Sequence, residues 1–203
     1  VTVSAPALPS GPATYQFAKI IPGTYAIADY GRYVEDLKAM DASGRPIAVN
    51  RSDSNTWVIA DGKRLATLSY LVNDTYDCEA GDAFTENSTT IFSPAGTNIL
   101  AGRNFMLNLC GFVGYFKDRK DIPYTLDITH PASLKWASSL EPLGTSADRD
   151  LFFLPRYAEM VDHPVMYAEP DQAYGKVGDM DLLLSIYSPR NKLVSAAAFF
   201  PDL

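Results

Sequence analysis

The sequence is poor in the residue patterns on which most enzymes and metalloproteins depend. It contains only two histidines, His130 and His163, and two cysteines, Cys78 and Cys110, among 203 residues. It has no HExxH motif and no CxxC pair, so nothing indicates a transition-metal site. A GxSxG nucleophile elbow, a GxxxxGKS/T phosphate loop and a dinucleotide fingerprint are missing as well. We therefore predict that this chain carries no catalytic machinery.

Basic clusters and long apolar runs are also scarce. The formal net charge is −7, with 17 Lys and Arg against 24 Asp and Glu, which opposes binding to nucleic-acid phosphates. The densest basic cluster, Lys117 to Lys120, is interrupted by Asp118 and predicts a solvated loop. No apolar run approaches the roughly 20 residues that cross a bilayer, so we expect neither a nucleic-acid partner nor a membrane span.

What is abundant points to β-structure. Twelve tyrosines, ten phenylalanines and fourteen prolines are typical of strands punctuated by turns. Turn signals recur about every ten residues at Asp41 to Gly44, Asp61-Gly62 and Asn73-Asp74. This spacing indicates an antiparallel sandwich or barrel. We predict one mostly-β domain over residues 1–203, an antiparallel β-sandwich with long loops and little helix.

Several local expectations accompany this fold. Strands are predicted at 1–3, 15–21, 32–40, 47–49, 56–59, 64–72, 104–116, 123–128, 151–154 and 180–187, the last of them buried. Asp61-Gly62 is expected to close a hairpin, and Trp136 to lie in a loop or single turn. Gly111 and Gly114 would ease a bulge or close packing. Helix is expected only at 156–161 and 192–200.

The segment Ile20 to Val34, IIPGTYAIADYGRYV, holds the most distinctive turn. Pro22 fixes φ at the second position of a turn, and Gly23 takes the positive φ of a type II turn without a Cβ clash. One strand should therefore end before the turn, and another should restart around Tyr25. A second distinctive stretch, Phe152 to Met166, reads FFLPRYAEMVDHPVM.

Together the two stretches resemble two signatures of the glycyl aminopeptidase family of zinc metallopeptidases, metallopeptidase family sixty-one. A Pro-Gly-Ser-Tyr turn of that family, with an Asp and an Arg before a Val, is matched here by Pro22, Gly23, Thr24, Tyr25, Ile27, Asp29, Arg32 and Val34. Its Tyr-Asp-Glu-Leu-Val-Asp-Ser-Pro run is matched by Tyr157, Ala158, Glu159, Met160, Val161, Asp162, His163 and Pro164. Thr24, Ala158 and His163 depart from the family's residues.

The resemblance implies an accessory N-terminal β-domain, with a truncated first strand and with residues 192–203 starting the linker to a catalytic domain outside this chain. A PDZ-like domain would follow in the parent. Zinc would bind in the catalytic domain, where it would polarise the scissile carbonyl and activate water. The partner would be that catalytic domain, and this domain could form one wall of the peptide-substrate cleft. The signature residues and candidate cleft residues are Pro22, Gly23, Tyr25, Asp29, Arg32, Tyr157, Asp162, His163 and Pro164. The competing interpretation is that these residues only pin the turn and the 157–164 corner internally.

Other interpretations stay open at this stage. The aromatic richness and the loop-heavy 77–104 region also suit a free-standing secreted β-sandwich that binds a glycan or a protein. A hydrolase that uses paired carboxylates is a third reading. Cys78 and Cys110 form either one disulfide or two free thiols. The acidic stretch 74–87 is either a calcium site or a solvated loop. The start VTVSAPAL, without Met, favours a periplasmic or secreted location over the cytoplasm.

Overall fold

The structure, a computed structural model, describes residues 1–24, 26–76, 91, 93–188 and 195–198. The strands are β1 (Thr2–Ser4), β2 (Ala13–Gln16), β3 (Val34–Asp41), β4 (Pro46–Ile47), β5 (Val49–Asp53), β6 (Thr56–Ile59), β7 (Leu65–Val72), β8 (Asn98–Leu100), β9 (Asn104–Leu107), β10 (Tyr115–Phe116), β11 (Tyr124–Thr129), β12 (Lys135–Ala137), β13 (Pro142–Thr145), β14 (Arg149–Leu154), β15 (Val165–Ala168), β16 (Asp171–Val177) and β17 (Met180–Ile186). The helices are α1 (Leu109–Phe112) and α2 (Glu159–Asp162), with 3₁₀ turns η1 (Tyr30–Tyr33) and η2 (Ser93–Ala95). The predicted mostly-β, antiparallel fold is confirmed.

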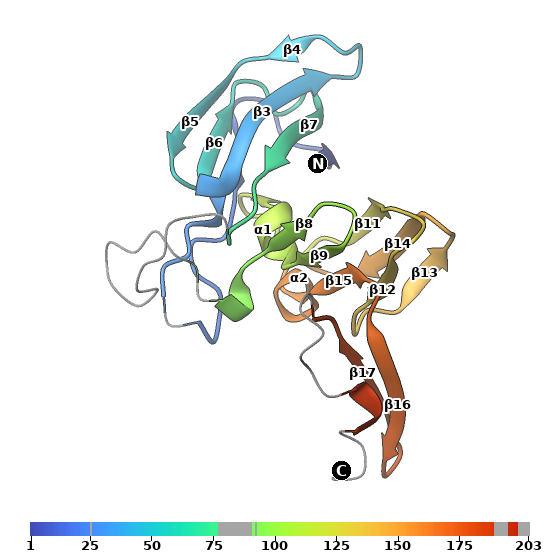
Figure 1. Ribbon diagram of the computed structural model, residues 1–203. Helices are drawn as coiled ribbons and strands as arrows, with labels where there is room; N and C mark the ends of the chain where they lie inside the picture. The colour runs from blue at the N-terminus through green and yellow to red at the C-terminus, as the bar shows by residue number, and fades with distance from the viewer. Residues whose placement is uncertain (25, 77–90, 92, 189–194, 199–203) are drawn as a thin grey trace.

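The described residues form five sheets, of which four pair into two sandwiches, shown in Figure 1 as an upper and a lower lobe. In the first sandwich the sheet β1-β7-β3-β4 faces the sheet β10-β2-β6-β5. Its core gathers side chains from both sheets, including Tyr15, Ile59 and Leu68. The period-2 alternation of strands explains this burial. In β7, Leu68 and Tyr70 point into the core, whereas Leu71 points to solvent and is 58% exposed.

The second sandwich places the sheet β11-β14-β13 against the sheet β12-β15-β9-β8. Its core contains Phe152 and Leu154 from β14 and Val165 and Tyr167 from β15, all fully buried. The inward positions of β14 begin with Asp150, which is also fully buried. The alternation of the strand therefore directs one carboxylate into an apolar core.

The fifth sheet is the hairpin β16–β17, which extends away from the lower lobe in Figure 1. The strand expected at 180–187 is present, but the prediction that it is buried is wrong. Met180 is 59% exposed and Leu183 is 41% exposed. The apolar run MDLLLSI predicted burial because it resembles a core strand, whereas among the described strands β17 pairs with β16 alone.

The opening turn forms as predicted, but the strands around it do not. Gly23 has φ +87°, and the Thr24 hydroxyl donates a hydrogen bond to the Ile21 carbonyl at 3.0 Å. The strand before the turn ends at Gln16, and the described residues 26–29 after the turn form no strand. Instead the Asp29 amide donates to the Lys19 carbonyl, and Asp29 has φ 48°. That left-handed conformation is incompatible with an extended strand, so the chain enters η1.

Three other local predictions were wrong. Asp61-Gly62 does not close a hairpin, since β6 pairs with β2 and β5 whereas β7 pairs with β1 and β3. The turn carries the chain from one sheet of the first sandwich to the other. The stretch 104–116 is interrupted by α1, and Trp136 lies in β12 rather than in a loop. No helix among the described residues is long and apolar enough to cross a membrane.

Candidate functional site

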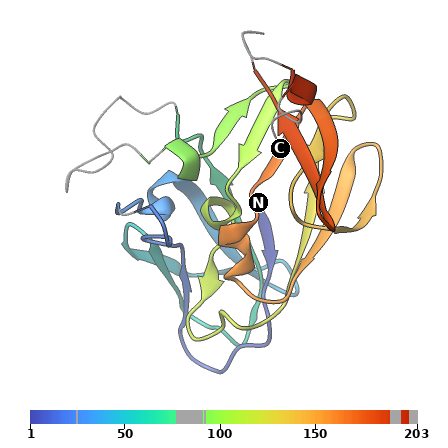
Figure 2. The same cartoon turned by 90° about the horizontal axis from the view of Figure 1, so that it is seen from below.

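The segment 109–116 connects the two sandwiches and is called the joint below. Figure 2 shows α1 and α2 side by side at the middle of the molecule. Side chains of the joint enter both cores: Cys110 and Phe116 belong to the first core, whereas Leu109 belongs to the second. Tyr115 packs against the second core, and its ring lies 4.8 Å from that of Tyr157. One short segment therefore contributes to both cores.

A chain of tyrosine hydroxyls ties the first sandwich to the joint. The Gly114 amide donates to the Tyr15 hydroxyl at 2.8 Å, and the Tyr70 hydroxyl donates to the Phe112 carbonyl at 2.8 Å. The two hydroxyl oxygens lie 3.1 Å apart. Because the Tyr70 proton is used on Phe112, Tyr15 donates to Tyr70. All three hydrogen bonds are thereby satisfied inside the protein.

The first signature stretch meets the joint through Tyr30. This tyrosine is buried, and its hydroxyl donates to the Ala95 carbonyl at 2.8 Å. Its ring lies against Gly111, where an added Cβ would be 3.2 Å from the Tyr30 Cδ1 atom. The prediction that Gly111 serves close packing is confirmed. Thus η1 is seated on one side of α1.

Asp29 and the glycine after Tyr30 are held by the turn between β5 and β6. The Asn55 side-chain amide donates to Asp29 Oδ1 at 2.6 Å, and Asn55 Oδ1 accepts a hydrogen bond from the Gly31 amide at 2.9 Å. A Cβ at Gly31 would be 2.4 Å from the Ser54 carbonyl oxygen. The Arg32 guanidinium lies over the Tyr33 ring, 5.0 Å from its centre. The backbone of η1 therefore packs closely against the turn between β5 and β6.

The second signature stretch meets the joint from the other side. Tyr157 is buried, its hydroxyl donates to the Val113 carbonyl at 3.0 Å, and its amide donates to the Lys120 carbonyl at 2.8 Å. In α2, Met160 is buried in the second core while Val161 packs against the first. The two signatures are therefore brought together through α1, each anchored to the joint.

The end of the second signature lies nearer the surface. Asp162 is exposed at the last residue of α2. His163 Nδ1 lies 2.8 Å from the Ser139 hydroxyl, and its Nε2 lies 3.5 Å from Glu159 Oε2. The Pro164 carbonyl accepts a hydrogen bond from the Ser138 hydroxyl at 2.9 Å. These polar groups form a local network at the corner that follows α2.

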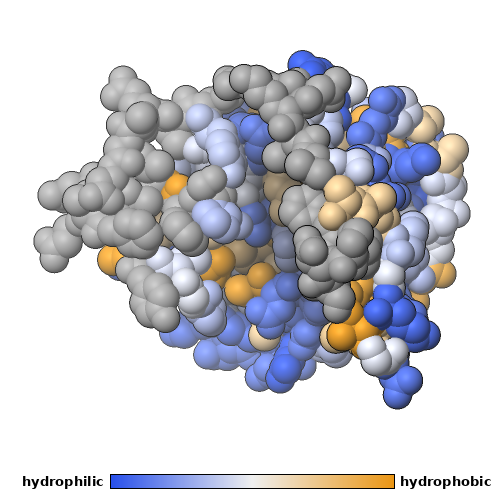
Figure 3. All heavy atoms as spheres, turned by 60° about the horizontal axis from the view of Figure 1, so that its bottom comes forward, coloured by the Kyte–Doolittle hydropathy of each residue, from blue (hydrophilic) through white to orange (hydrophobic). Residues whose placement is uncertain are grey.

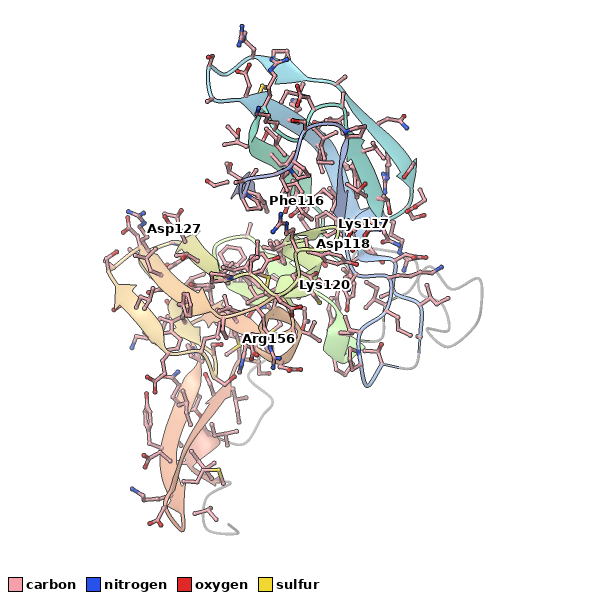
Figure 4. The ribbon with its side chains drawn as sticks, turned by 180° about the vertical axis from the view of Figure 1, so that it is seen from behind. Phe116, Lys117, Asp118, Lys120, Asp127 and Arg156 are labelled. Carbon is pink, nitrogen blue, oxygen red and sulfur yellow. The ribbon has the colours of Figure 1, made fainter. Side chains whose placement is uncertain are left out.

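Two further signature residues, Pro22 and Gly23, are exposed at the opening turn, and Tyr25 lies outside the described residues. The predicted solvated loop is confirmed: Lys117, Asp118 and Lys120 are exposed and follow β10 between the lobes, as Figure 4 shows. The Lys120 ammonium sits 4.2 Å above the Tyr115 ring. The loop therefore covers the joint from outside.

Sequence reasoning missed a buried polar cluster in the second core. Asp150 Oδ2 accepts a hydrogen bond from the Tyr167 hydroxyl at 3.0 Å, and His130 Nε2 also lies 3.0 Å from it. The latter distance suits an ion pair, although the N–H direction misses hydrogen-bond geometry. The His130 ring stacks on Tyr167, with centres 4.4 Å apart. The only signal in the sequence was the inward position of Asp150 on β14.

Burial sets the acid–base behaviour of the joint. It raises the pKa of the Cys110 thiol from 9.0 to about 11 and that of Tyr124, beside Tyr157, from 10.0 to about 12. The pKa values of Tyr15, Tyr70 and Tyr157 are likewise raised, chiefly by desolvation of the phenolate. In the folded chain these groups keep their protons into alkaline solution.

We expect the free energy of unfolding to fall as the pH rises above about 9. Below that pH, Cys110 is protonated in both states and contributes no pH dependence. Between pH 9 and 11 the Cys110 thiol loses its proton in the unfolded chain but keeps it in the folded chain, so the free energy of unfolding falls. The buried tyrosines have the same effect from about pH 10. Urea midpoints at pH 7, 9 and 10.5 measure this. Cys110→Ala should remove the fall in the urea midpoint between pH 9 and 10. A midpoint of the unsubstituted protein that stays constant from pH 7 to 10.5 would contradict the prediction.

The predicted calcium site and the predicted disulfide depend on residues that the structure does not describe. Of the acidic stretch 74–87, Asp74 is described, and its carboxylate accepts hydrogen bonds from the Tyr76 and Ile99 amides. Asp77, Glu79, Asp82 and Glu86 lie outside. Within the described part of the chain Cys110 has no disulfide partner, but Cys78 lies outside it, so the bridge stays a prediction. No group of three or more His, Cys, Asp or Glu among the described residues could hold a metal ion.

Comparisons with known proteins identify a family and a similar fold. The chain matches the family described as Peptidase M61 N-terminal domain over residues 1–169. It is similar to the crystal structure of an aminopeptidase N family protein from Idiomarina loihiensis, with a TM-score of 0.71 and 18% sequence identity. That likeness covers 92% of this chain but only 29% of the other, and at this identity it shows a shared fold. No curated protein matches. The family match spans both signatures and the whole joint.

Proposed function

We propose, because this chain belongs to the Peptidase M61 N-terminal domain family, that it is the non-catalytic N-terminal domain of an aminopeptidase-like zinc metallopeptidase. In this proposal the domain packs on the catalytic domain of the same polypeptide and forms part of the wall of the peptide-substrate cleft. The observation that carries the accessory role is the placement of both signatures at the joint. Their buried tyrosines, Tyr30 and Tyr157, fix one sandwich against the other.

Zinc does not fit the described residues of this chain. The two histidines lie in separate settings, His130 buried beside Asp150 and His163 at the corner with Ser139 and Glu159. A zinc site needs three or four converging nitrogen, sulfur or carboxylate ligands, and no described group supplies three. In the proposal the zinc belongs to the catalytic domain. A periplasmic or secreted location is part of the proposal.

The cleft role rests on the exposed corner after α2. Among the described signature residues, Asp162, Pro22 and Gly23 are open to solvent, whereas Tyr157 is internal. An exposed carboxylate beside the His163 network could contact the free amino terminus of a peptide, since opposite charges attract at short range. At this corner a neighbouring domain or a substrate can reach the second signature.

The test uses the full-length parent polypeptide. We expect EDTA-sensitive cleavage of a glycyl or alanyl p-nitroanilide, and Asp162→Ala should raise KM by about 2- to 10-fold with kcat unchanged, because one polar contact to the bound substrate is lost. Asp121→Ala, which removes an exposed carboxylate from the loop near the joint, is the matched control. Absence of peptidase activity, or activity that survives EDTA, would overturn the peptidase proposal. An unchanged KM would remove the cleft role alone.

A further inference from the structure

The hairpin β16–β17 is structurally separate from both sandwiches. Its strands pair over seven residue pairs from Asp171↔Ile186 to Val177↔Met180, closed by Gly178 with φ +58°. It forms a two-stranded sheet with no further strand on either edge within the described chain. A two-stranded hairpin alone in water is marginally stable, so this element needs a surface to pack against.

One face of the hairpin is apolar from Ala173 to the tip, with Asp171 at its root. Directly opposed residues of an antiparallel pair share a face, so Ala173 with Leu184, Gly175 with Leu182 and Val177 with Met180 lie on the same side. Toward the root this face is covered, since Ala173 is only 9% exposed. Toward the tip it is open: Val177 is 41% exposed and Met180 is 59% exposed.

The opposite face is mixed. Its Tyr174–Leu183 pair, 76% and 41% exposed, is flanked by cross-strand polar pairs. One is the Lys176–Asp181 ion pair at 3.2 Å, and the other is the hydrogen bond from Gln172 to Ser185 at 3.2 Å. Figure 3 brings this end of the molecule forward and shows apolar side chains at the surface beside polar ones. Apolar residues gathered at one projecting tip are typical of a protein interface.

The position of the hairpin in the chain indicates which partner covers its apolar face. The family match ends at residue 169, directly before β16, and the similar structure belongs to a chain of which this one spans 29%. The backbone after the hairpin is tied to its root, because the Ala196 amide donates to Asp171 Oδ2 at 2.6 Å. The described residues 195–198 thus lie beside the root of the hairpin. Three aspartates and one lysine in 171–187 also favour a partner with a basic rim.

We propose that the apolar face of β16–β17, ending in Val177 and Met180, is the surface on which the catalytic domain of the parent peptidase packs. This inference rests on the proposed function and adds to it the site of contact. The open tip of the hairpin is covered in the full-length protein. The root, shielded already, sets the direction in which the tip meets its partner.

The experiment is amide hydrogen exchange on the full-length parent. We expect β16–β17 amides to exchange at least 100-fold more slowly than an unstructured peptide, because the contact removes local opening. The Val177→Asp/Met180→Asp variant should lose at least tenfold of that protection, while β14 amides stay protected and report an intact core. Val177→Ala/Met180→Ala should lose less. Leu143→Asp, at a site 66% exposed on β13, is the matched control and should change nothing in the hairpin.

Three outcomes would overturn the proposal. The hairpin could exchange as fast as an unstructured peptide in the unsubstituted protein. Protection could be the same in the doubly charged variant. Protection could also rise with protein concentration, which would make a second copy of the chain the occupant. The exchange readout does not depend on turnover, so loss of the peptidase proposal, seen as absent EDTA-sensitive cleavage, is recognised separately.

Discussion

Replacing Gly114 with alanine should destabilise the domain by about 3 kcal/mol or more. The added Cβ would lie 2.3 Å from the Gln16 carbonyl oxygen and 3.0 Å from both the Gln16 carbonyl carbon and the Tyr15 ring. Two of these three atoms belong to the backbone of β2, which cannot move without breaking its pairing with β6 and β10. The Gly114 amide also donates to the Tyr15 hydroxyl, so any shift weakens the tyrosine chain.

Gly144 provides the matched control for this substitution. It lies in β13, and a Cβ there meets no atom within 4 Å. Gly144→Ala should therefore change the free energy of unfolding by no more than about 0.5 kcal/mol. Urea unfolding of both variants, followed by circular dichroism, measures the difference. Equal stability of the two variants would show that the joint tolerates movement of β2, and would refute the close packing inferred for it.

Replacing His130 with alanine should cost about 3–5 kcal/mol of stability. The substitution leaves the Asp150 carboxylate fully buried with the Tyr167 hydroxyl as its hydrogen-bond donor, since Asp150 Oδ1 has no partner among the described residues. Removing one member of a buried polar pair is expensive because the other keeps its desolvation penalty. Thermal unfolding of the variant measures the loss.

A double variant separates charge from packing. In His130→Ala/Asp150→Asn the buried carboxyl group without its histidine partner is gone, so we expect the double variant to be more stable than His130→Ala alone, with non-additivity of at least about 1 kcal/mol. The exposed Asp127–Arg149 pair on the same sheet is the comparison, and Asp127→Asn should leave the unfolding temperature almost unchanged. Additive effects at 130 and 150 would mean that the pair carries no coupling.

The sequence was most informative where structure is local. Alternation located β7 and β6, with β6 matching residues 56–59, and Pro22-Gly23 predicted a turn that the structure confirms with φ +87° at Gly23. Strand 180–187 was found, but its burial depended on neighbours that periodicity does not report. Local pattern defines an element, whereas exposure is decided by what packs on it.

The joint could not be predicted because its contacts are long-range. Tyr15 and the Gly114 amide are 99 residues apart in sequence, and β10 joins a sheet whose other strands end at residue 59. The four-residue α1 is too short to show a helical period. The His130–Asp150 pair was hidden for another reason: a lone histidine before a proline and an aspartate after a turn look like surface residues.

The division of segment 109–116 between two cores has a consequence for synthesis on the ribosome. Proteins are made from the N-terminus, and an early-emerging domain usually folds before the rest is made. Here the first sandwich lacks an edge strand and the Phe116 side chain until residue 116 has left the exit tunnel. The nascent chain must therefore keep its first sheets unfinished while about forty further residues are added after β7. We expect co-translational folding of the first sandwich to be completed only after residue 116 has emerged, whereas the second sandwich waits for β15, which ends at Ala168.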